Sequence, residues 1–248
     1  MNPEVSVVVP LHNEEQNIGP LIEELTRVLS GLGLPYEVLL VDDGSTDRTF
    51  ERVVELQTRD RAVRAIRFTG NFGQTAAFAA GFSHARGQFI VTLDGDLQND
   101  PSDIPKMLAI ARDKDIVCGW RRQRQDAFLT RHVPSVVANW LLGLVSGVRI
   151  HDNGCSLKVF RASVVKPLKL RPGMHRYFPA LASQLGDRIQ EVEVHHRPRR
   201  YGQSNYGLSR TFRVVGDLLQ LRRLMREAVA DRTEAPSLYE IAEIRETA

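Results

Sequence analysis

The chain has 248 residues, and its 33 lysine and arginine side chains nearly balance 30 aspartate and glutamate side chains. This length fits one large domain or two small ones, while so small a net charge indicates little about partners. Two cysteines, Cys118 and Cys155, are too few for a disulfide framework or a cysteine metal cluster. We therefore expect buried free thiols in a reducing cytoplasm. No secretory signal is expected, because the apolar run at residues 5–9 is short and ends at Pro10.

Strands and helices are predicted to alternate along the first half of the chain. Helices are expected between the strands, with Ser45 or Thr46 capping the second helix and Ser102 capping the fourth. This alternation is typical of an α/β fold with a mainly parallel sheet. The predicted strands are residues 4–10, 36–41, 63–68, 89–93 and 115–119, and the predicted helices are residues 18–29, 50–56, 74–85 and 102–111.

Polar clusters follow four of these predicted strands. In α/β sheets, ligands bind beyond the carboxyl ends of the strands, so these clusters should converge on one crevice. A chance distribution of solvated surface residues would not place all of them at strand ends. The clusters are Pro10, His12 and Glu14; Asp42 and Asp43; Asn71 and Gly73; and Asp94 and Asp96.

The stretch Asp94-Gly95-Asp96 places two carboxylates one residue apart at the end of a buried strand. Such carboxylates repel each other unless a counter-charge lies nearby. Mg²⁺ or Mn²⁺ prefers oxygen ligands and usually keeps positions open for substrate phosphates. An Asp-Gly turn with solvated carboxylates is the alternative for this stretch alone, but the other strand-end clusters favour a functional site.

The composition changes from Trp120 onward. Four arginines precede an apolar segment at residues 133–148, namely Arg121, Arg122, Arg124 and Arg131. The segment is shorter than the roughly 20 residues that a membrane-spanning helix needs, and a proline and several polar residues interrupt it. We therefore expect that it does not cross a membrane.

Further elements are predicted in the second half of the chain. The amphipathic character of the last helix suits a membrane surface, a neighbouring subunit or the protein's own core. Residues 234–248 are polar, so we expect them to be disordered or weakly helical. The predicted elements are strands at 157–160 and 189–195 and helices at 175–186 and 209–225.

Six stretches of the chain together resemble family 2 glycosyltransferases of the GT-A fold, in particular the branch that transfers sugars to dolichyl and polyprenyl phosphates. They cover roughly residues 4–215 in the order of that family. The resemblance implies a Rossmann-like, mainly parallel sheet flanked by helices, with a C-terminal helical extension. The stretches are VSVVVPLHNEEQNI, VLLVDDGSTD, NFGQTAAFAAGF, LDGDLQNDP, DNGCSLKVFR and HHRPRRYGQSNYG.

This resemblance also implies the domain organisation. We expect one glycosyltransferase domain at residues 1–226, with an acceptor-side segment at about 120–152, followed by a polar tail at 227–248. Many relatives continue into transmembrane helices that hold them beside their lipid substrate. We expect none in this chain.

The resemblance implies a metal-dependent, inverting transfer of a sugar from a UDP- or GDP-linked donor. Asp94 and Asp96 match the metal-binding pair of the family, and Gln98 completes a site for Mg²⁺ or Mn²⁺. His12 stands where several relatives carry tyrosine, so stacking on the base can differ. The residues implied in donor binding are Pro10, His12, Glu14, Asp42, Asp43, Asn71, Gly73, Arg199 and Ser204.

Arg121, Arg131 and Ser135 match the region that grips the lipid phosphate in the polyprenyl-phosphate branch. An acceptor phosphate is already largely ionised at neutral pH, with a second pKa near ~6, so it needs positioning more than a base. The forked donors of arginine suit that role. A hydroxyl acceptor would instead require a general base, for which Asp152 is the best candidate. Alternatively, Asp152 is a loop residue that orients an arginine.

The basic run Arg197, Arg199 and Arg200 lies before a glycine-containing loop. Such a run is either a solvated face or a loop that closes over a diphosphate, and the neighbouring loop favours the second interpretation. Relatives commonly carry GKSK where this chain has the residues GQSN at 202–205, so we expect up to two fewer cationic contacts to the diphosphate.

The sequence leaves more than one function open. Transfer of a hexose-like sugar to polyprenyl phosphate is the leading hypothesis, by a cytoplasmic protein in peripheral contact with the inner face of the plasma membrane. Transfer to a saccharide or other soluble hydroxyl is the alternative, and a nucleotide-sugar-binding protein with little catalysis is an alternative of another class. A homo-oligomer is compatible with the sequence. Nucleic acid is disfavoured as a partner, because the arginines are not interleaved with aromatic residues.

Overall fold

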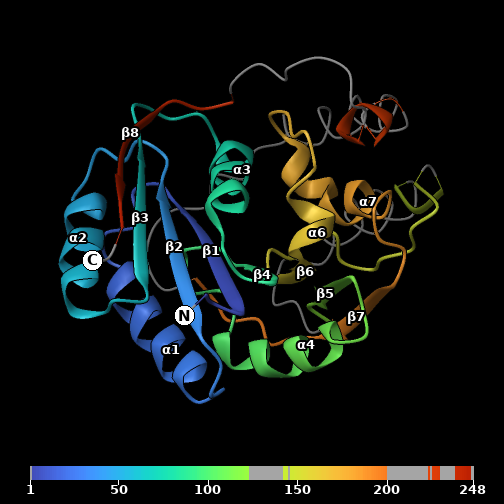
Figure 1. Cartoon of the computed structure of the whole chain (residues 1–248), viewed down its shortest axis with the longest axis horizontal. Coiled ribbons are helices and arrows are strands. Elements are labelled where there is room, and N and C mark those ends of the chain that lie inside the picture. Colours follow the sequence, from blue (N-terminus) through green and yellow to red (C-terminus); the bar gives the residue numbers. More distant parts are fainter. Residues whose placement is uncertain are drawn as a thin grey trace.

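The structure is a computed structural model, and it describes residues 2–122, 142–144, 146–199, 223, 225–229 and 238–246 (Figure 1). These residues form an eight-stranded sheet in the order β7-β5-β6-β4-β1-β2-β3-β8. The strands are β1 (Val5–Leu11), β2 (Tyr36–Asp42), β3 (Val63–Phe68), β4 (Phe89–Thr92), β5 (Ile116–Trp120), β6 (Lys158–Arg161), β7 (Ile189–Glu193) and β8 (Ile241–Arg245).

The sheet is mainly parallel at its centre, as predicted. β1 pairs in parallel with β2 and β4, β2 with β3, and β5 with β7. β6 is antiparallel to both of its neighbours, β4 and β5, and β8 is antiparallel to β3. The predicted α/β class is therefore confirmed.

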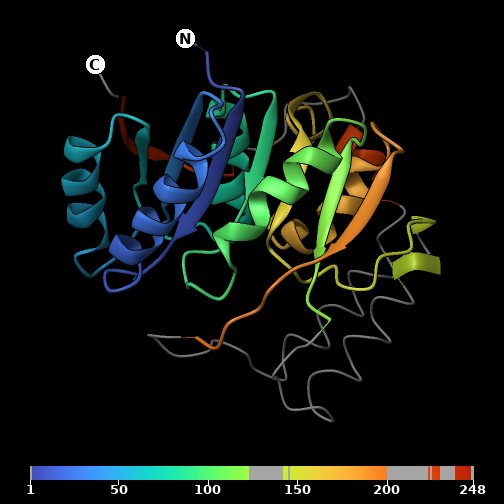
Figure 2. The ribbon, with the colours of Figure 1, turned by 90° about the horizontal axis from the view of Figure 1, so that it is seen from below.

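Helices cover both faces of the sheet (Figures 1 and 2). One apolar core lies between the sheet and α1, α2 and α4, and a second lies between the sheet and α3, α6 and α7. The longer helices are α1 (Ile18–Ser30), α2 (Thr49–Arg59), α3 (Gln74–His84) and α4 (Ile104–Ala111), and the shorter ones are η1 (Pro101–Asp103), α6 (Ala162–Val165), η3 (Met174–Tyr177) and α7 (Phe178–Ala182).

Helix α3 packs unusually close to the sheet because its inner face carries small residues. Ala76, Ala77, Ala80 and Gly81 are all buried. A Cβ atom at Gly81 would lie 2.1 Å from a methyl group of Val8 on β1, so a larger residue would push the helix away. The N-terminus of α3 is thereby held directly above the carboxyl ends of the central strands.

The predicted helix caps were wrong, because the hydroxyl residues have other partners. Helix α2 begins at Thr49, whose backbone N–H donates to the Asp47 side chain at 3.0 Å. The Ser45 hydroxyl instead accepts from the backbone N–H of Asn13 at 3.0 Å. Before α4, the Asp100 side chain accepts from the Ser102 N–H at 2.9 Å and caps the η1 turn.

The predicted helix at residues 175–186 is divided in the structure. The η3 turn ends at Tyr177, and α7 begins at Phe178 with Pro179 in its first turn. Proline fits the first turn of a helix, where its missing N–H costs no hydrogen bond, so it starts a new helix here. The predicted strand at 189–195 is two residues shorter, as β7 ends at Glu193.

The prediction that residues 234–248 are disordered or weakly helical was wrong for the described part of this range. Strand β8 pairs with the edge strand β3, and the ring of Tyr239 stacks on Phe68 with 5.0 Å between ring centroids. Ile241 packs against the core on the same side. A strand of five residues thus extends the sheet within the predicted polar tail.

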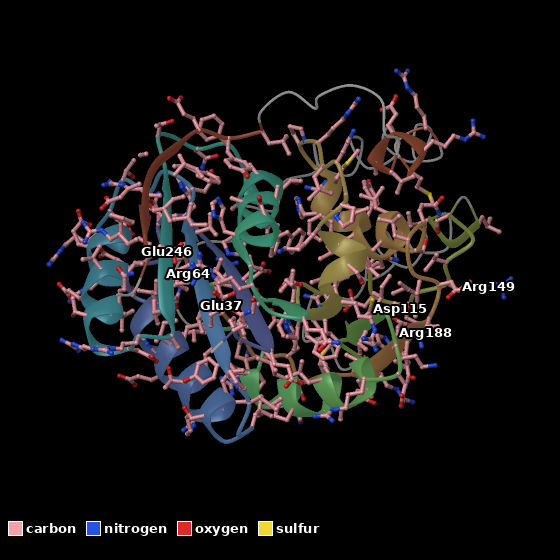
Figure 3. The ribbon with its side chains drawn as sticks, viewed as in Figure 1. Glu37, Arg64, Asp115, Arg149, Arg188 and Glu246 are labelled. Atoms are coloured by element: carbon pink, nitrogen blue, oxygen red, sulfur yellow. The ribbon has the colours of Figure 1, made fainter. Side chains whose placement is uncertain are left out.

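An ion-pair network with a buried Arg64–Glu37 pair links the end of β8 to the amino ends of the central strands (Figure 3). Arg64 pairs with Glu37 and with Glu246, each at 2.6 Å, and the Ser6 hydroxyl donates to Glu37. Removal of one partner would leave a buried charge without compensation. This network stabilises the edge of the sheet opposite the polar clusters.

None of the helices in the described residues is long and apolar enough to span a membrane. Most of the predicted apolar segment at 133–148 lies outside the described residues, as does most of the predicted helix at 209–225.

Candidate active site

The loops that follow β1, β2, β3 and β4 meet at one edge of the sheet. The pairing of Leu11 with Asp42, and of Val8 with Thr92, brings these strand ends to the same level. Gly44, which has a positive φ of 65°, lies against the next loop, where a Cβ atom would be 2.4 Å from a Gly70 backbone atom. The predicted polar clusters are therefore brought together, and we call this set of loops the donor side.

Asp42 is completely buried at the base of the donor side. One carboxylate oxygen accepts from the Ser45 N–H at 3.2 Å, while the other has no hydrogen-bond partner among the described residues. The Arg67 guanidinium is 3.6 Å from that second oxygen. Burial raises the pKa of Asp42. A buried acceptor that lacks a hydrogen bond favours a ligand that donates an N–H group, as a nucleobase does.

The imidazole of His12 and the amide of Asn71 lie beside Asp43. His12 Nδ1 is 2.9 Å from the Asp43 backbone oxygen and 3.2 Å from Asn71 Nδ2. The Asp43 carboxylate itself accepts from the backbone N–H groups of Phe72 and Gly73, at 2.6 and 2.9 Å. Asp43 therefore fixes the loop that leads into α3, whereas His12 and Asn71 form the surface of the donor side.

Asp94 and Asp96 lie on a tight turn directly after β4. Gln74, the first residue of α3, donates to Asp94 at 2.7 Å, and Arg199 pairs with Asp96 at 2.7 Å. A Cβ atom at Gly95 would be 2.7 Å from a Leu11 methyl group, so a larger residue would require the Leu11 side chain to move. Burial, and then the negative charge of Asp96, raise the pKa of Asp94 to about 6.

The donor set of this turn fits a divalent cation. Asp94 and Asp96 supply carboxylate oxygens. The pKa of the nearby Glu14 is raised, first by burial and then by the negative charges of Asp96 and Asp94. The Gln98 side-chain amide donates to the Arg197 backbone oxygen at 3.5 Å. No three His, Cys, Asp or Glu side chains gather as ligands within the described residues, so a metal here would complete its coordination from a ligand such as a diphosphate.

Arg121, which directly follows β5, forms a bidentate ion pair with Asp152. Arg121 Nε and Nη2 lie 2.8 and 3.0 Å from the two Asp152 oxygens, and the Arg121 backbone N–H also donates to Asp152. Asp152 is only 3% exposed. The charge of Arg121 lowers the pKa of Asp94, so the pair lies within electrostatic reach of the carboxylate turn. This arrangement matches the interpretation of Asp152 as a residue that orients an arginine.

Comparison with known proteins identifies the family. The family described as "Glycosyl transferase family 2" matches residues 6–168. The chain belongs to this family. Its fold is similar to that of glucosyl-3-phosphoglycerate synthase from Mycobacterium tuberculosis in complex with Mn²⁺, UDP-glucose and phosphoglyceric acid, with a TM-score of 0.69 over 99% of this chain and 90% of that chain. At 19% identity, this likeness establishes the GT-A type of fold and nothing further.

Two curated relatives are more similar in sequence. Dodecaprenyl-phosphate galacturonate synthase of Rhizobium johnstonii is 47% identical over 228 residues, which is 90% of this chain and 68% of that protein. Undecaprenyl-phosphate 4-deoxy-4-formamido-L-arabinose transferase of Salmonella paratyphi B is 37% identical over 216 residues, 87% of this chain and 66% of that protein. The chain therefore spans about two thirds of the length of these relatives. The predicted resemblance to family 2 glycosyltransferases is confirmed.

Several residues of this glycosyltransferase site were not singled out from the sequence. Lys158, at the start of β6, is buried, and its ammonium donates to the backbone oxygens of Asn153 and Cys155. Ser156, in the same turn, donates to Asn99 at 2.7 Å, and its backbone oxygen accepts from Thr92. We call Arg121, Asp152 and the turn at residues 153–156 the acceptor side.

Two contacts made by the first residues of α3 were also missed. Gln74, which holds Asp94, lies within the stretch NFGQTAAFAAGF and could have been found from its place at the start of a predicted helix. Thr75 contacts His175 at 2.8 Å across 100 residues of sequence, and no local pattern predicts such a contact.

Three predicted site residues lie outside the described residues: Arg131, Ser135 and Ser204. Both cysteines are buried and free, as expected, and burial raises the pKa of the Cys118 thiol to about 12. Neither thiol therefore has the accessible thiolate that a nucleophile requires.

Proposed function

We propose that this glycosyltransferase moves a sugar from a nucleoside diphosphate to the phosphate of a polyprenyl phosphate, at the cytoplasmic face of the membrane. The proposal is supported by two charged groups within electrostatic reach of each other. One is the pair of carboxylates Asp94 and Asp96, and the other is the guanidinium of Arg121, which Asp152 orients. One group suits a cation-bound diphosphate and the other suits a phosphate acceptor. The names of the two curated relatives, which include dodecaprenyl phosphate and undecaprenyl phosphate, support this acceptor class.

The donor side would bind the nucleoside and its diphosphate. The Asp42 oxygen that lacks a hydrogen bond would accept a base N–H group, and His12 and Asn71 would contact the base or ribose at the surface. Asp94 and Asp96 would hold Mg²⁺ or Mn²⁺, which, when bound, supplies Lewis-acid stabilisation of the negative charge on the leaving diphosphate. Gln74 keeps the Asp94 carboxylate in place through its 2.7 Å hydrogen bond.

On the acceptor side, Arg121 would position the attacking phosphate. An oxygen of the acceptor phosphate forms a bond to the anomeric carbon, and the bond from that carbon to the donor diphosphate breaks, with inversion. The phosphate is already ionised near neutral pH, so no side chain has to remove a proton. Asp152 accepts from two guanidinium nitrogens and fixes the plane of Arg121. Arg131 and Ser135 remain predicted contacts to the same phosphate.

A hydroxyl acceptor is disfavoured by the same ion pair. In that reaction Asp152 would serve as general base, but both of its oxygens already accept from Arg121. A carboxylate that is stabilised in its charged form by a guanidinium is a weak proton acceptor. We therefore favour the phosphate acceptor.

The identity of the sugar is open within this proposal. The named relatives carry galacturonate and 4-deoxy-4-formamido-L-arabinose rather than a plain hexose. We propose that this chain takes a comparable oxidised or amide-substituted sugar, and the donor panel should include both kinds beside UDP-hexoses and GDP-hexoses.

A transfer assay tests the proposal. The protein is incubated with Mn²⁺ or Mg²⁺, a panel of radiolabelled nucleotide sugars and a short polyprenyl phosphate, and the label that enters the organic phase is counted. We expect transfer from at least one donor to the phosphate, and none to the matching polyprenol. Donor binding without transfer to any lipid would overturn the proposal and leave a nucleotide-sugar-binding protein. Equal transfer to the polyprenol would indicate a hydroxyl acceptor.

A further inference from the structure

Arg199 lies directly against the carboxylate turn that would hold the cation. Its Nη2 atom is 2.7 Å from Asp96 Oδ2, and the Asp96 side chain is only 9% exposed. The positive charge of Arg199 also lowers the pKa of Glu14, beside the same turn. A guanidinium therefore neutralises part of the negative charge in the position where a divalent cation is needed.

The segment before Arg199 is fixed along the loop that follows the carboxylate turn. The His195 N–H donates to Asp103 at 2.7 Å, and the Arg197 N–H donates to the Gln98 backbone oxygen at 2.9 Å. The Arg197 side chain pairs with Glu24 at 2.7 Å and with Asp100 at 2.6 Å. These contacts anchor the backbone two residues before Arg199, so its long side chain can change partner while the segment stays in place.

We infer that Arg199 is an internal cation that competes with the metal for Asp96 and transfers to the diphosphate when the metal-bound donor binds; this rests on the proposed function. Asp96 Oδ2 cannot hold a guanidinium and a divalent cation at the same distance, because the two positive charges repel each other. Entry of the metal therefore releases Arg199 from Asp96. The donor diphosphate then offers Arg199 an anion that two forked N–H groups can bind.

This exchange couples the binding of metal and donor. Without a donor, metal binding breaks the Arg199–Asp96 pair, which opposes the binding of the metal alone. With a donor, the diphosphate becomes the new partner of Arg199, so each ligand favours the other. Donor binding should depend strongly on this coupling in this chain. Gln203 and Asn205 stand where relatives carry lysines, so fewer cations remain for the diphosphate.

The test measures Mn²⁺ binding to the nucleotide-free protein, by electron paramagnetic resonance of free Mn²⁺, for the wild type and Arg199→Gln. Removal of the competing cation should tighten Mn²⁺ binding by about fivefold, the size expected for a partly exposed ion pair. The same variant should bind UDP more weakly at saturating Mn²⁺, so the two affinities move in opposite directions. Arg199→Lys should fall between the wild type and Arg199→Gln in both measurements.

Two controls define the site and the specificity of the effect. Asp94→Asn should abolish the binding of Mn²⁺, which shows that the carboxylate turn is the site being measured. Arg52→Gln removes an exposed arginine that is paired with Glu55, far from the turn in the sequence, and should leave Mn²⁺ affinity unchanged. Unchanged or weaker Mn²⁺ binding in Arg199→Gln would overturn the inference.

The outcome is separable from that of the transfer assay. If Arg199→Gln binds Mn²⁺ more tightly but the protein transfers no sugar to any lipid, the proposed function is contradicted and the exchange at Asp96 is supported. If the wild type transfers sugar but Arg199→Gln binds Mn²⁺ more weakly, the proposed function is supported and the exchange is contradicted.

Discussion

The carboxylates of the donor side and of the acceptor side are compensated in different ways. On the donor side, Asp42 has an oxygen without a hydrogen-bond partner in the described structure, and the pKa of Asp94 is raised to about 6. On the acceptor side, the Asp152 carboxylate is matched by the two-pronged guanidinium of Arg121. The donor side therefore keeps one carboxylate oxygen without a hydrogen bond and one carboxyl group with a raised pKa, while the Arg121–Asp152 pair of the acceptor side is internally neutralised.

This difference shows where each ligand contributes stability. A buried carboxylate without full compensation costs free energy, which the fold tolerates where a ligand later supplies the missing cation or donor. A compensated pair costs little and holds a fixed geometry. We conclude that the ligands supply compensating charge and N–H groups on the donor side, and that the acceptor side orients the acceptor phosphate.

The largest expected effect concerns the carboxylate turn. Asp94→Asn or Asp96→Asn should lower metal-dependent transfer by about 10³-fold or more, because Lewis-acid stabilisation of a leaving diphosphate is worth several kcal/mol. The measurement is the initial rate of label transfer over a range of Mn²⁺ concentrations. Asp113→Asn, which changes an exposed carboxylate before β5, is the matched control and should retain the wild-type rate. Full activity in both turn variants would remove the assigned metal role.

The second prediction separates orientation from base catalysis at Asp152. Asp152→Asn should destabilise the protein by about 3–5 kcal/mol, because it leaves Arg121 without its partner in a largely buried site. Transfer should fall by about 10- to 100-fold, since the acceptor phosphate is misplaced and its proton chemistry is unaffected. Denaturant unfolding and initial rates give the two values.

A double-mutant cycle sharpens this test. If Asp152 acts only through Arg121, the double variant Arg121→Gln/Asp152→Asn should lose no more activity than the more impaired single variant. If Asp152 is instead a general base, its replacement should remove the corresponding ionisation from the pH–rate profile, whether or not Arg121 is present.

The donor side could be largely predicted from the sequence. Each cluster follows an apolar strand, and parallel pairing alone brings Asp42 and Asp94 to the same edge of the sheet. These are local patterns joined by one general rule of α/β folds. The division of roles between Asp42 and Asp43 could not be predicted, because it depends on which carboxylate the loop at Phe72 and Gly73 uses.

The acceptor side could be predicted only in outline. Arg121 and Asp152 are 31 residues apart, so no spacing reveals that these charges pair. The same holds at the carboxylate turn for Arg199 and Asp96, which are 103 residues apart. Strand β8 was missed for a related reason. It lies within a mostly polar tail, and its order depends on pairing with β3 and on the contact of Arg64 with Glu246, 182 residues further along the chain.

The third prediction tests how the acceptor side keeps its shape. Lys158→Met should remove the two hydrogen bonds to the Asn153 and Cys155 carbonyls and destabilise the protein by about 1–3 kcal/mol. The turn that carries Asp152 should then hold Arg121 less precisely, so the KM for polyprenyl phosphate should rise while the KM for the donor stays near its wild-type value. Lys114→Met, at a residue before β5, is the control. A rise in the donor KM alone would contradict this division of the site.

The smallest expected effect is a pH dependence on the donor side. The pKa of Asp94 is raised from 3.8 to about 6, so the folded metal-free protein binds a proton there more tightly than the unfolded chain does. Its contribution to stability is therefore fully present below about pH 4 and is lost as the pH rises through 6. The size is on the order of 1–3 kcal/mol.

The measurement compares the free energy of unfolding of the wild type and Asp94→Asn in chelator between pH 4 and 7. Other buried carboxylates, including Glu14 and Asp42, also have raised pKa values, so only the difference between the two proteins isolates Asp94. At pH 7 the free energy of unfolding should be larger for Asp94→Asn than for the wild type, and this difference should become smaller as the pH falls to 5. With saturating Mn²⁺ the wild type should instead lose stability below pH 6, because protons and the cation compete for the same carboxylate. A difference that does not change with pH would mean that Asp94 already has its compensating charge, and the contrast between the two sides would then rest on Asp42 alone.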